Sequence, residues 1–207
     1  MTLLEAATSQ TLMSWMHGRR SIRRYRPEPL PAATIERLLD AARFAPSAHN
    51  RQPWRFAVLR SEVEKQRLAT AMGERLRTDR LADGDDAVAI ERDIACSHAR
   101  ITAAPAVIVA CLTLADMDRY ADAQRAEAER LMAVQSTAMA VQNMLLLAHA
   151  EGLAACWMCA PLFCPDTVRA ALDLPADWQP QAAITLGRPA ATGKPRERRP
   201  IAEVARL

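Results

Sequence analysis

The chain has 207 residues, of which 50% are hydrophobic and 25% charged, and its formal net charge is +3. This balance excludes disordered and fibrous classes, and the length corresponds to a single domain over residues 1–207. The longest apolar run, Ala103–Leu112, is too short to span a membrane, and the first ten residues lack the basic start and apolar core of a signal peptide. We therefore expect a cytoplasmic protein whose five cysteines are reduced and mostly buried.

The hydrophobic pattern along the chain predicts both helices and short strands. In the first half of the chain we predict a short helix ending near Gly18, a helix over 33–44, a strand over 54–59 and a helix capped by Ser61 and Glu64. A surface loop at 83–86, a helix over 86–101 and a buried central strand over 106–112 follow. In the second half we predict a helix over 126–151, a strand over 154–158, a helix over 166–172 capped by Asp166, and a strand over 181–187. Helices flanking about four short strands, without strict alternation, indicate the α+β class.

Two features suggest contacts beyond one chain. The helix over 126–151 has apolar residues every three or four positions, and Gly152 is placed to end it in a left-handed conformation. So regular a stripe requires a partner helix along its length, which predicts that this is the core helix of the domain, with a dimer seam as a second way to cover it. The predicted stripe is Leu131, Val134, Ala138, Val141, Leu145 and Ala148.

The tail 188–207 is rich in proline and arginine, and its Ile201 and Val204 suggest that it lies along another surface, such as a second subunit.

Positive charge is concentrated in two short segments. Five arginines lie within residues 19–26, and four basic residues lie within residues 194–199. Two compact clusters on a nearly neutral chain favour a small anionic ligand, such as a phosphate, over a broad nucleic-acid surface, although solvated arginines on exposed turns would give the same pattern. The six glycines form neither a G-x-G-x-x-G turn nor a P-loop, so side chains must hold any phosphate.

Common catalytic and metal-binding patterns find little support. Cys156 and Cys159 form a single C-x-x-C without the second pair of a structural zinc site, the four histidines show no H-x-x-x-H spacing, and Ser47 lies in no G-x-S-x-G elbow. The connection over 46–54 is instead dense in hydrogen-bonding side chains. Ser47, Asn50 and Gln52 suit an amide- or uracil-like edge, or they satisfy the backbone of their own turn.

Four of these stretches together resemble the flavin-dependent nitroreductase family, in family order and spacing from about residue 14 to residue 204. They are Arg19–Arg23, Pro46–Trp54, Gly152–Ala160, and Leu186–Pro189 followed by Arg196–Pro200. The resemblance implies a three-layer α-β-α sandwich with a mostly antiparallel sheet, and a homodimer with exchanged C-terminal tails and FMN at the subunit interface. It implies a two-step exchange through flavin N5, in which NAD(P)H is the donor and a nitroaromatic, quinone or similar small molecule the acceptor. Neither a nucleic acid nor a membrane is an expected partner.

The resemblance also assigns roles to individual residues, none of them an acid, base or nucleophile, because the flavin carries the chemistry. It implies that the phosphate, ribityl chain and pyrimidine edge of FMN contact Arg19, Arg20, Ser21 and Arg23, and that Arg196 and Arg198 complete the phosphate site. The ring is expected to be covered, from the other subunit, by Pro46, Ser47, Ala48 and Asn50. Backbone N–H groups near N5 and O4 are expected from Met158, Cys159 and Ala160. No metal ligand is expected. The sequence departs from the family at Ala48, where many members have a second serine, and at Cys159–Ala160, which replaces a commoner glycine pair.

Three alternatives stay open from the sequence. One is a specialised nitroreductase-like enzyme of coenzyme biosynthesis, which reduces a deazaflavin intermediate or fragments its own flavin. Another is a flavin-binding module without catalysis. The third is an arginine-rich nucleic-acid binder, which the near balance of acids and bases and the lack of interleaved aromatic residues other than Tyr25 disfavour.

Overall fold

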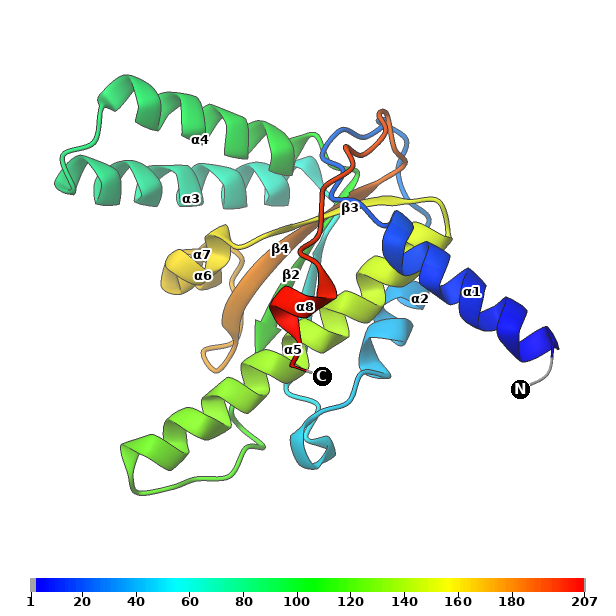
Figure 1. Ribbon diagram of the computed structural model, residues 1–207. Coiled ribbons are helices and arrows are strands. Elements are labelled where there is room, and N and C mark those ends of the chain that lie inside the picture. The colour runs from blue at the N-terminus through cyan, green and yellow to red at the C-terminus, as the bar shows by residue number, and fades with distance from the viewer. Residues whose placement is uncertain (1–2, 207) are drawn as a thin grey trace.

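A four-stranded antiparallel sheet forms the centre of the computed structural model, which describes residues 3–206 and side chains from residue 8 onward. The strands are β1 (Trp54–Leu59), β2 (Ala106–Leu112), β3 (Ala154–Met158) and β4 (Gln179–Gly187), in the order β1-β2-β4-β3 (Figure 1). Every residue of β2 is buried, which confirms the predicted central strand. β1 and β3 therefore form opposite edges of the sheet. Residues 1–2 and 207 of the predicted domain lie outside the described residues.

Helices cover both faces of the sheet (Figure 1). They are α1 (Leu3–Gly18), α2 (Ala32–Arg43), α3 (Glu62–Ala82), α4 (Ala87–Thr102), α5 (Ala123–Ala150), α6 (Ala160–Phe163), α7 (Pro165–Ala171) and α8 (Ile201–Val204). Ile108 of β2 points into the core shared with α2 and α5, and its neighbour Val109 into the core shared with α3 and α7. The predicted α+β class with an antiparallel sheet flanked by helices is confirmed, whereas the exchange of tails stays a prediction.

Local signals placed most element boundaries correctly. Ser61 Oγ accepts a hydrogen bond from the Glu64 backbone N–H (3.2 Å), and Glu64 Oε2 accepts one from the Ser61 N–H (3.2 Å), so the capping box is present. Gly152 has φ +71°, as a left-handed helix end requires. Two details are wrong: α1 is longer than the short helix predicted, and α7 begins at Pro165, so Asp166 lies in its first turn and pairs with Arg169 instead of capping it.

The apolar stripe predicted along α5 is only half correct. Val141, Leu145 and Ala148 are buried, but Leu131 is 46% exposed and Ala138 is exposed as well. The N-terminal half of α5 extends past the sheet (Figure 1), so Leu131 and Ala138 lie at the surface. Its Ala133 and Val134 pack instead in a small cluster with Leu112 and Met117. By length and composition α5 is the one described helix that could cross a membrane, but its C-terminal half packs on α2 and the sheet as a core helix does.

Candidate functional site

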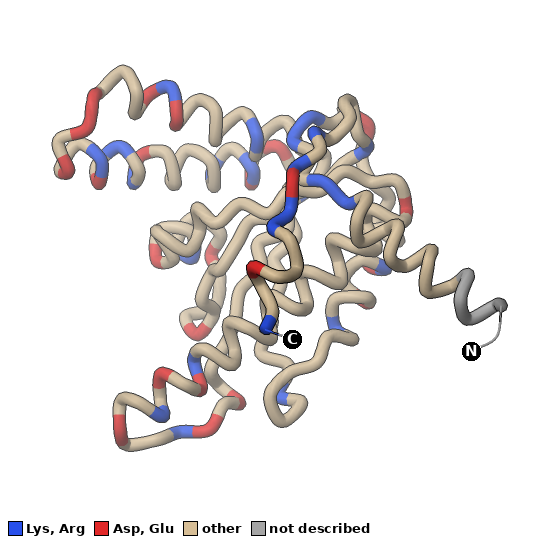
Figure 2. The backbone as a smooth tube through the Cα atoms, viewed as in Figure 1, with Lys and Arg blue, Asp and Glu red and all other residues tan. Residues whose placement is uncertain are grey.

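The two basic segments lie side by side although they come from opposite ends of the chain (Figure 2). The Ile22 N–H donates to the Ala155 carbonyl of β3 (3.2 Å) on one side. On the other side the Ala190 N–H donates to the Arg24 carbonyl (3.0 Å), and the Arg26 N–H donates to the Arg188 carbonyl (2.9 Å). The segment after α1 is thereby held between β3 and the C-terminal tail, and its arginines are gathered at one corner of the molecule.

Tyr25 fixes this segment to the sheet. Its hydroxyl lies 2.7 Å from Thr185 Oγ1 of β4 and 2.8 Å from the Ile22 carbonyl oxygen. Burial raises the pKa of Tyr25 above its ordinary value, and the hydrogen bond with Thr185 only partly opposes this, so the phenol stays neutral at physiological pH. The position of Ile22 and its neighbours is therefore set by a partly buried side chain and does not depend on the loop alone.

A cleft of about 630 Å³ opens between the basic segment and the tail. Its lining residues include Ser21, Arg23, Arg24, Lys194 and Arg196. Among the described residues none of these four cations has a carboxylate partner, whereas arginines elsewhere pair with acids, as Arg37 does with Glu151 and Arg77 with Glu91. A hydroxyl surrounded by unpaired cations is the donor set of an anion-binding site.

The tail approaches the basic segment through a glycine. A Cβ atom on Gly193 would lie 2.2 Å from the Cβ of Arg20, so the tail backbone takes up this position only without a side chain. The Arg20 guanidinium donates to the carbonyl oxygens of His17 and Arg19, the latter at 2.9 Å, and so closes the end of α1. Arg198 similarly donates to the carbonyls of Arg196 and Glu197, both at 3.1 Å. Of the predicted basic-segment and tail residues, the cleft lining thus includes Ser21, Arg23 and Arg196. It does not include Arg19, Arg20 or Arg198.

A further arginine, Arg100, lies near β3, and it was not among the residues predicted from the sequence. Burial raises the pKa of the Cys156 thiol, and the nearby guanidinium groups of Arg23, Arg100 and Arg19 act in the opposite direction. Arg100 lies in the last turn of α4. No local pattern distinguishes it from any other exposed arginine on a helix, so only the fold reveals that it joins Arg19 and Arg23 beside this strand.

The third predicted segment follows directly after β3. Met158 is the last residue of the strand, Cys159 is the N-cap of α6 and Ala160 is its first residue. The helix itself offers no acceptor for backbone N–H groups at this end. Cys159 is exposed, and its Sγ accepts a hydrogen bond from Trp157 Nε1 (3.1 Å). Cys156, the other member of the C-x-x-C, is buried, as are Cys111 and Cys164, in agreement with mostly buried thiols.

The predicted segment Pro46–Trp54, the turn after α2, lies elsewhere. It contains a 3-10 turn at Ala48–Asn50 and leads into β1, the edge strand opposite β3. His49, Asn50 and Gln52 all have positive φ values, 49°, 54° and 50°, although none is glycine. Ser47 Oγ accepts a hydrogen bond from the Gln52 N–H (3.0 Å), so part of the polar content of the turn satisfies its own backbone. Within one chain, Pro46, Ser47, Ala48 and Asn50 are not brought to the arginine cleft.

A family model for the nitroreductase family matches residues 16–188, which include the arginine segment, the turn, β3 and β4. The chain belongs to the nitroreductase family. It is therefore a member of an oxidoreductase family, and the recognition made from its four motifs is confirmed.

Individual relatives agree with this membership. The chain is 32% identical to an NADH dehydrogenase of Thermus thermophilus, over 90% of each chain, and 32% identical to a 5,6-dimethylbenzimidazole synthase of Rhodospirillum rubrum, over 95% of this chain and 86% of the relative. Its fold matches the crystal structure of a protein from Desulfovibrio desulfuricans that is assigned as a nitroreductase and is in complex with FMN. That match has a TM-score of 0.71 and 29% identity, and it covers 94% of both chains.

Proposed function

We propose that this protein is a homodimeric FMN-dependent oxidoreductase that uses NAD(P)H to reduce electron-poor acceptors such as nitroaromatics and quinones. The observation that carries the proposal is the cleft in which Ser21 lies among unpaired cations from both ends of the chain. The FMN in the related Desulfovibrio structure supports the identity of the anion as the phosphate of FMN.

The residues present fit that cofactor. A phosphate monoester carries nearly two negative charges and several acceptor oxygens, and the cleft offers a hydroxyl and four cationic side chains without competing carboxylates. Further along β3, the N–H groups at Cys159 and Ala160 suit the N5 and O4 atoms of a flavin edge. Side chains thus replace the glycine-rich phosphate turn that the sequence lacks. When bound, FMN would supply the hydride and electron transfer.

The chain's own residues would then position the flavin ring and polarise it. Arg23 and Arg100 place positive charge beside β3, which favours negative charge on the pyrimidine side of a ring lying there. Tyr25 holds the segment that carries Ser21 and Arg23, so both donors keep their places when a ligand enters or leaves. No side chain needs to act as an acid or base. Donor and acceptor use the same site in turn, so steady-state kinetics are expected to be ping-pong.

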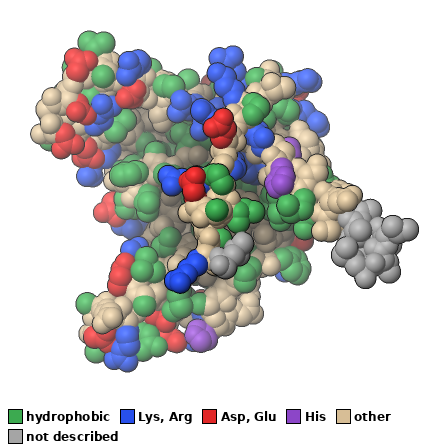
Figure 3. Space-filling model, in the orientation of Figure 1, with side chains coloured by type: hydrophobic (Ala, Val, Ile, Leu, Met, Phe, Trp, Pro, Cys, Tyr) green, Lys and Arg blue, Asp and Glu red, His purple; other side chains and the backbone are tan. Residues whose placement is uncertain are grey.

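Two observations support a homodimer. The arginine cleft and the turn at Ala48–Asn50 lie at opposite edges of the sheet, so a ring bound near β3 can be covered by such a turn only from a second chain. In addition, large apolar side chains are exposed on the face that carries α1 and the tail (Figure 3). Trp15 and Ile201, for example, are 44% and 70% exposed. Apolar surface of this kind is typical of a subunit interface.

The visible spectrum and sedimentation of the purified protein test the proposal together. We expect a yellow dimer whose flavin absorbance bleaches under anaerobic NADH or NADPH and returns on addition of a quinone or nitroaromatic. A colourless monomer that does not take up added FMN would contradict the proposal. A dimer that holds FMN but does not bleach with either nucleotide would be a flavin-binding module without this activity.

A second candidate is favoured by one relative. Because the 5,6-dimethylbenzimidazole synthase is as similar to this chain as the NADH dehydrogenase is, fragmentation of the bound flavin is the alternative reaction. The two are separated by reducing the protein in air, with oxygen as the only acceptor. A reductase returns its flavin intact over many cycles, whereas a synthase loses flavin absorbance in proportion to a benzimidazole product found by mass spectrometry.

A further inference from the structure

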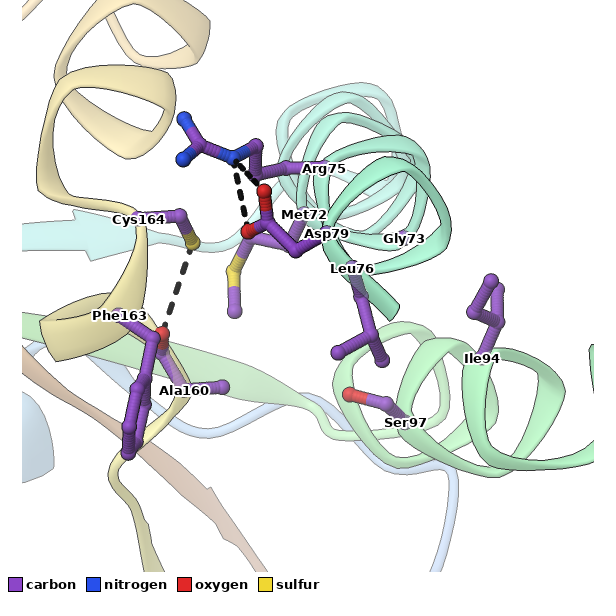
Figure 4. A pocket seen from close by; sticks show the side chains of 10 residues that line it. All are labelled: Met72, Gly73, Arg75, Leu76, Asp79, Ile94, Ser97, Ala160, Phe163 and Cys164. Atoms are coloured by element: carbon purple, nitrogen blue, oxygen red, sulfur yellow. Dashed lines mark hydrogen bonds and ion pairs between the residues drawn. The ribbon is translucent and has the colours of Figure 1, made fainter. Parts of the chain in front are cut away.

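A cavity of about 110 Å³ lies between α3, α4 and α6, separate from the arginine cleft (Figure 4). Its walls are mainly apolar and include Met72 and Leu76 of α3, Ile94 of α4 and Phe163 of α6. α3 and α4 approach closely at Gly73, where a Cβ atom would lie 2.9 Å from Ile94 Cγ2. The cavity also reaches Ala160, the residue whose N–H we assign to the flavin edge.

The two charges at this cavity neutralise each other. Arg75 Nε donates to both carboxylate oxygens of Asp79, each at 2.8 Å, and Figure 4 shows the pair together on α3. A charged ligand would lose its hydration in the apolar walls without gaining a free counter-ion. The cavity therefore suits an uncharged molecule.

One polar group in the cavity has no partner. Ser97 Oγ of α4 is directed into the cavity (Figure 4), and within the described part of the chain it makes no hydrogen bond. Other helical hydroxyl groups of this protein donate to the carbonyl four residues earlier: Thr102 of α4 to His98 (3.0 Å) and Ser136 of α5 to Met132 (2.7 Å). Ser97 thus remains available to a ligand atom inside the cavity.

The size and the lining atoms favour an aromatic ring. An apolar cavity of roughly 150 Å³ in another protein binds benzene, so a cavity of this order accepts one six-membered ring and not two. The sulfur atoms of Met72 and Cys164 line the cavity, and sulfur makes favourable contacts with aromatic rings. Phe163 is 78% exposed, so its ring can shift to admit a ligand and then pack against it.

We propose that this cavity binds an uncharged, single-ring aromatic molecule, with the ring against Met72, Ile94 and Phe163 and one hydrogen-bonding substituent on Ser97 Oγ. Ala160 lines this cavity and is also assigned to the flavin edge in the proposed function, so the cavity is a ligand site apart from the place where donor and acceptor meet the flavin.

Binding is tested without turnover by fluorine NMR of 4-fluorophenol added to the flavin-loaded protein at pH 7. We expect saturable binding, weaker binding of 4-fluorotoluene, which lacks the hydroxyl, and none of the anion 4-fluorobenzoate. Ser97→Ala is expected to reduce the affinity for 4-fluorophenol about fivefold, the usual effect of one neutral hydrogen bond, and to leave the affinity for 4-fluorotoluene unchanged. Equal binding of the benzoate, or an unchanged affinity of Ser97→Ala for 4-fluorophenol, would overturn the proposal.

A filling substitution provides the second arm. Ile94→Phe, or Leu76→Phe if that variant does not fold, is expected to reduce the affinity for both neutral probes at least tenfold. Val88→Phe adds similar bulk to the same helix at a position that is 76% exposed, and it should bind like the wild type. Flavin bleaching by NAD(P)H is recorded on the same samples. Bleaching without probe binding would overturn the cavity proposal alone, and probe binding without bleaching would overturn the proposed function alone.

Discussion

Removal of one tail arginine should separate the affinity for FMN from the affinity for riboflavin. Arg196 lines the cleft, is exposed, and has no carboxylate partner among the described residues, so Arg196→Met removes a cation without disturbing an ion pair. A hydrogen bond to a charged group contributes about 1.5–3 kcal/mol, which corresponds to a loss of roughly 10- to 150-fold in FMN affinity. Riboflavin has no phosphate, so its affinity should not change. The melting temperature should also stay the same, because surface substitutions away from such contacts have small effects.

The measurement is the quenching of flavin fluorescence on titration of each flavin into protein freed of cofactor. Arg92→Met is the matched control, since Arg92 is a 76% exposed arginine on α4 whose ion-pair contact with Asp93 is long, at 3.5 Å. It should preserve the ratio of FMN to riboflavin affinity. An unchanged ratio in Arg196→Met, or an equal loss for both flavins, would refute the assignment of the tail arginine to a phosphate.

Three further predictions concern stability. Tyr25→Phe should lower the free energy of unfolding by about 1–3 kcal/mol in urea titrations, because the phenol hydrogen bonds to β4 are lost, whereas Tyr120→Phe at an exposed position should have little effect. Burial raises the pKa of Cys111 to about 12, so the folded chain holds a proton that the unfolded chain releases above about pH 9. This one group should lower the free energy of unfolding by up to about 1.4 kcal/mol for each pH unit above that value, and the raised pKa values of Cys156 and Cys164 act in the same direction. The lowered pKa of buried Lys65 acts in the opposite direction, and Cys111→Ala should make the decline less steep. Ser61→Ala should cost about 0.5–2 kcal/mol through loss of the capping box, measured by thermal unfolding.

The fold was largely predictable because its elements carry local signals. The capping box of Ser61, the left-handed Gly152 and the apolar β2 each specify their structure from a few neighbouring residues. The prediction of a continuous buried stripe on α5 was wrong in its N-terminal half. Periodicity identifies which residues share a helix face, but whether Leu131 is buried depends on how far the helix extends past the sheet, which no local pattern records.

The site was predictable only as separate segments. The basic clusters, the turn and the residues after β3 were all visible in the sequence, but their spatial relation comes from the pairing of Ile22 with β3 and of Arg24 with the tail. Arg100 could not be found in advance, since its importance depends on where α4 ends relative to β3. The positive φ values in the turn were equally hidden, because neither His49 nor Asn50 is a glycine.

The strand order explains why a site of this kind calls for two chains. In the order β1-β2-β4-β3 the turn before β1 and the donors around β3 occupy opposite edges, and the sheet between them is buried on both faces. No small movement within one chain can bring these edges together. In the proposed dimer a two-fold axis would do so, since each turn would then meet the partner's β3 and two equivalent sites would form. The tail arginines would bind one end of the cofactor and the second chain would cover the other, so cofactor retention and dimer formation should stabilise each other.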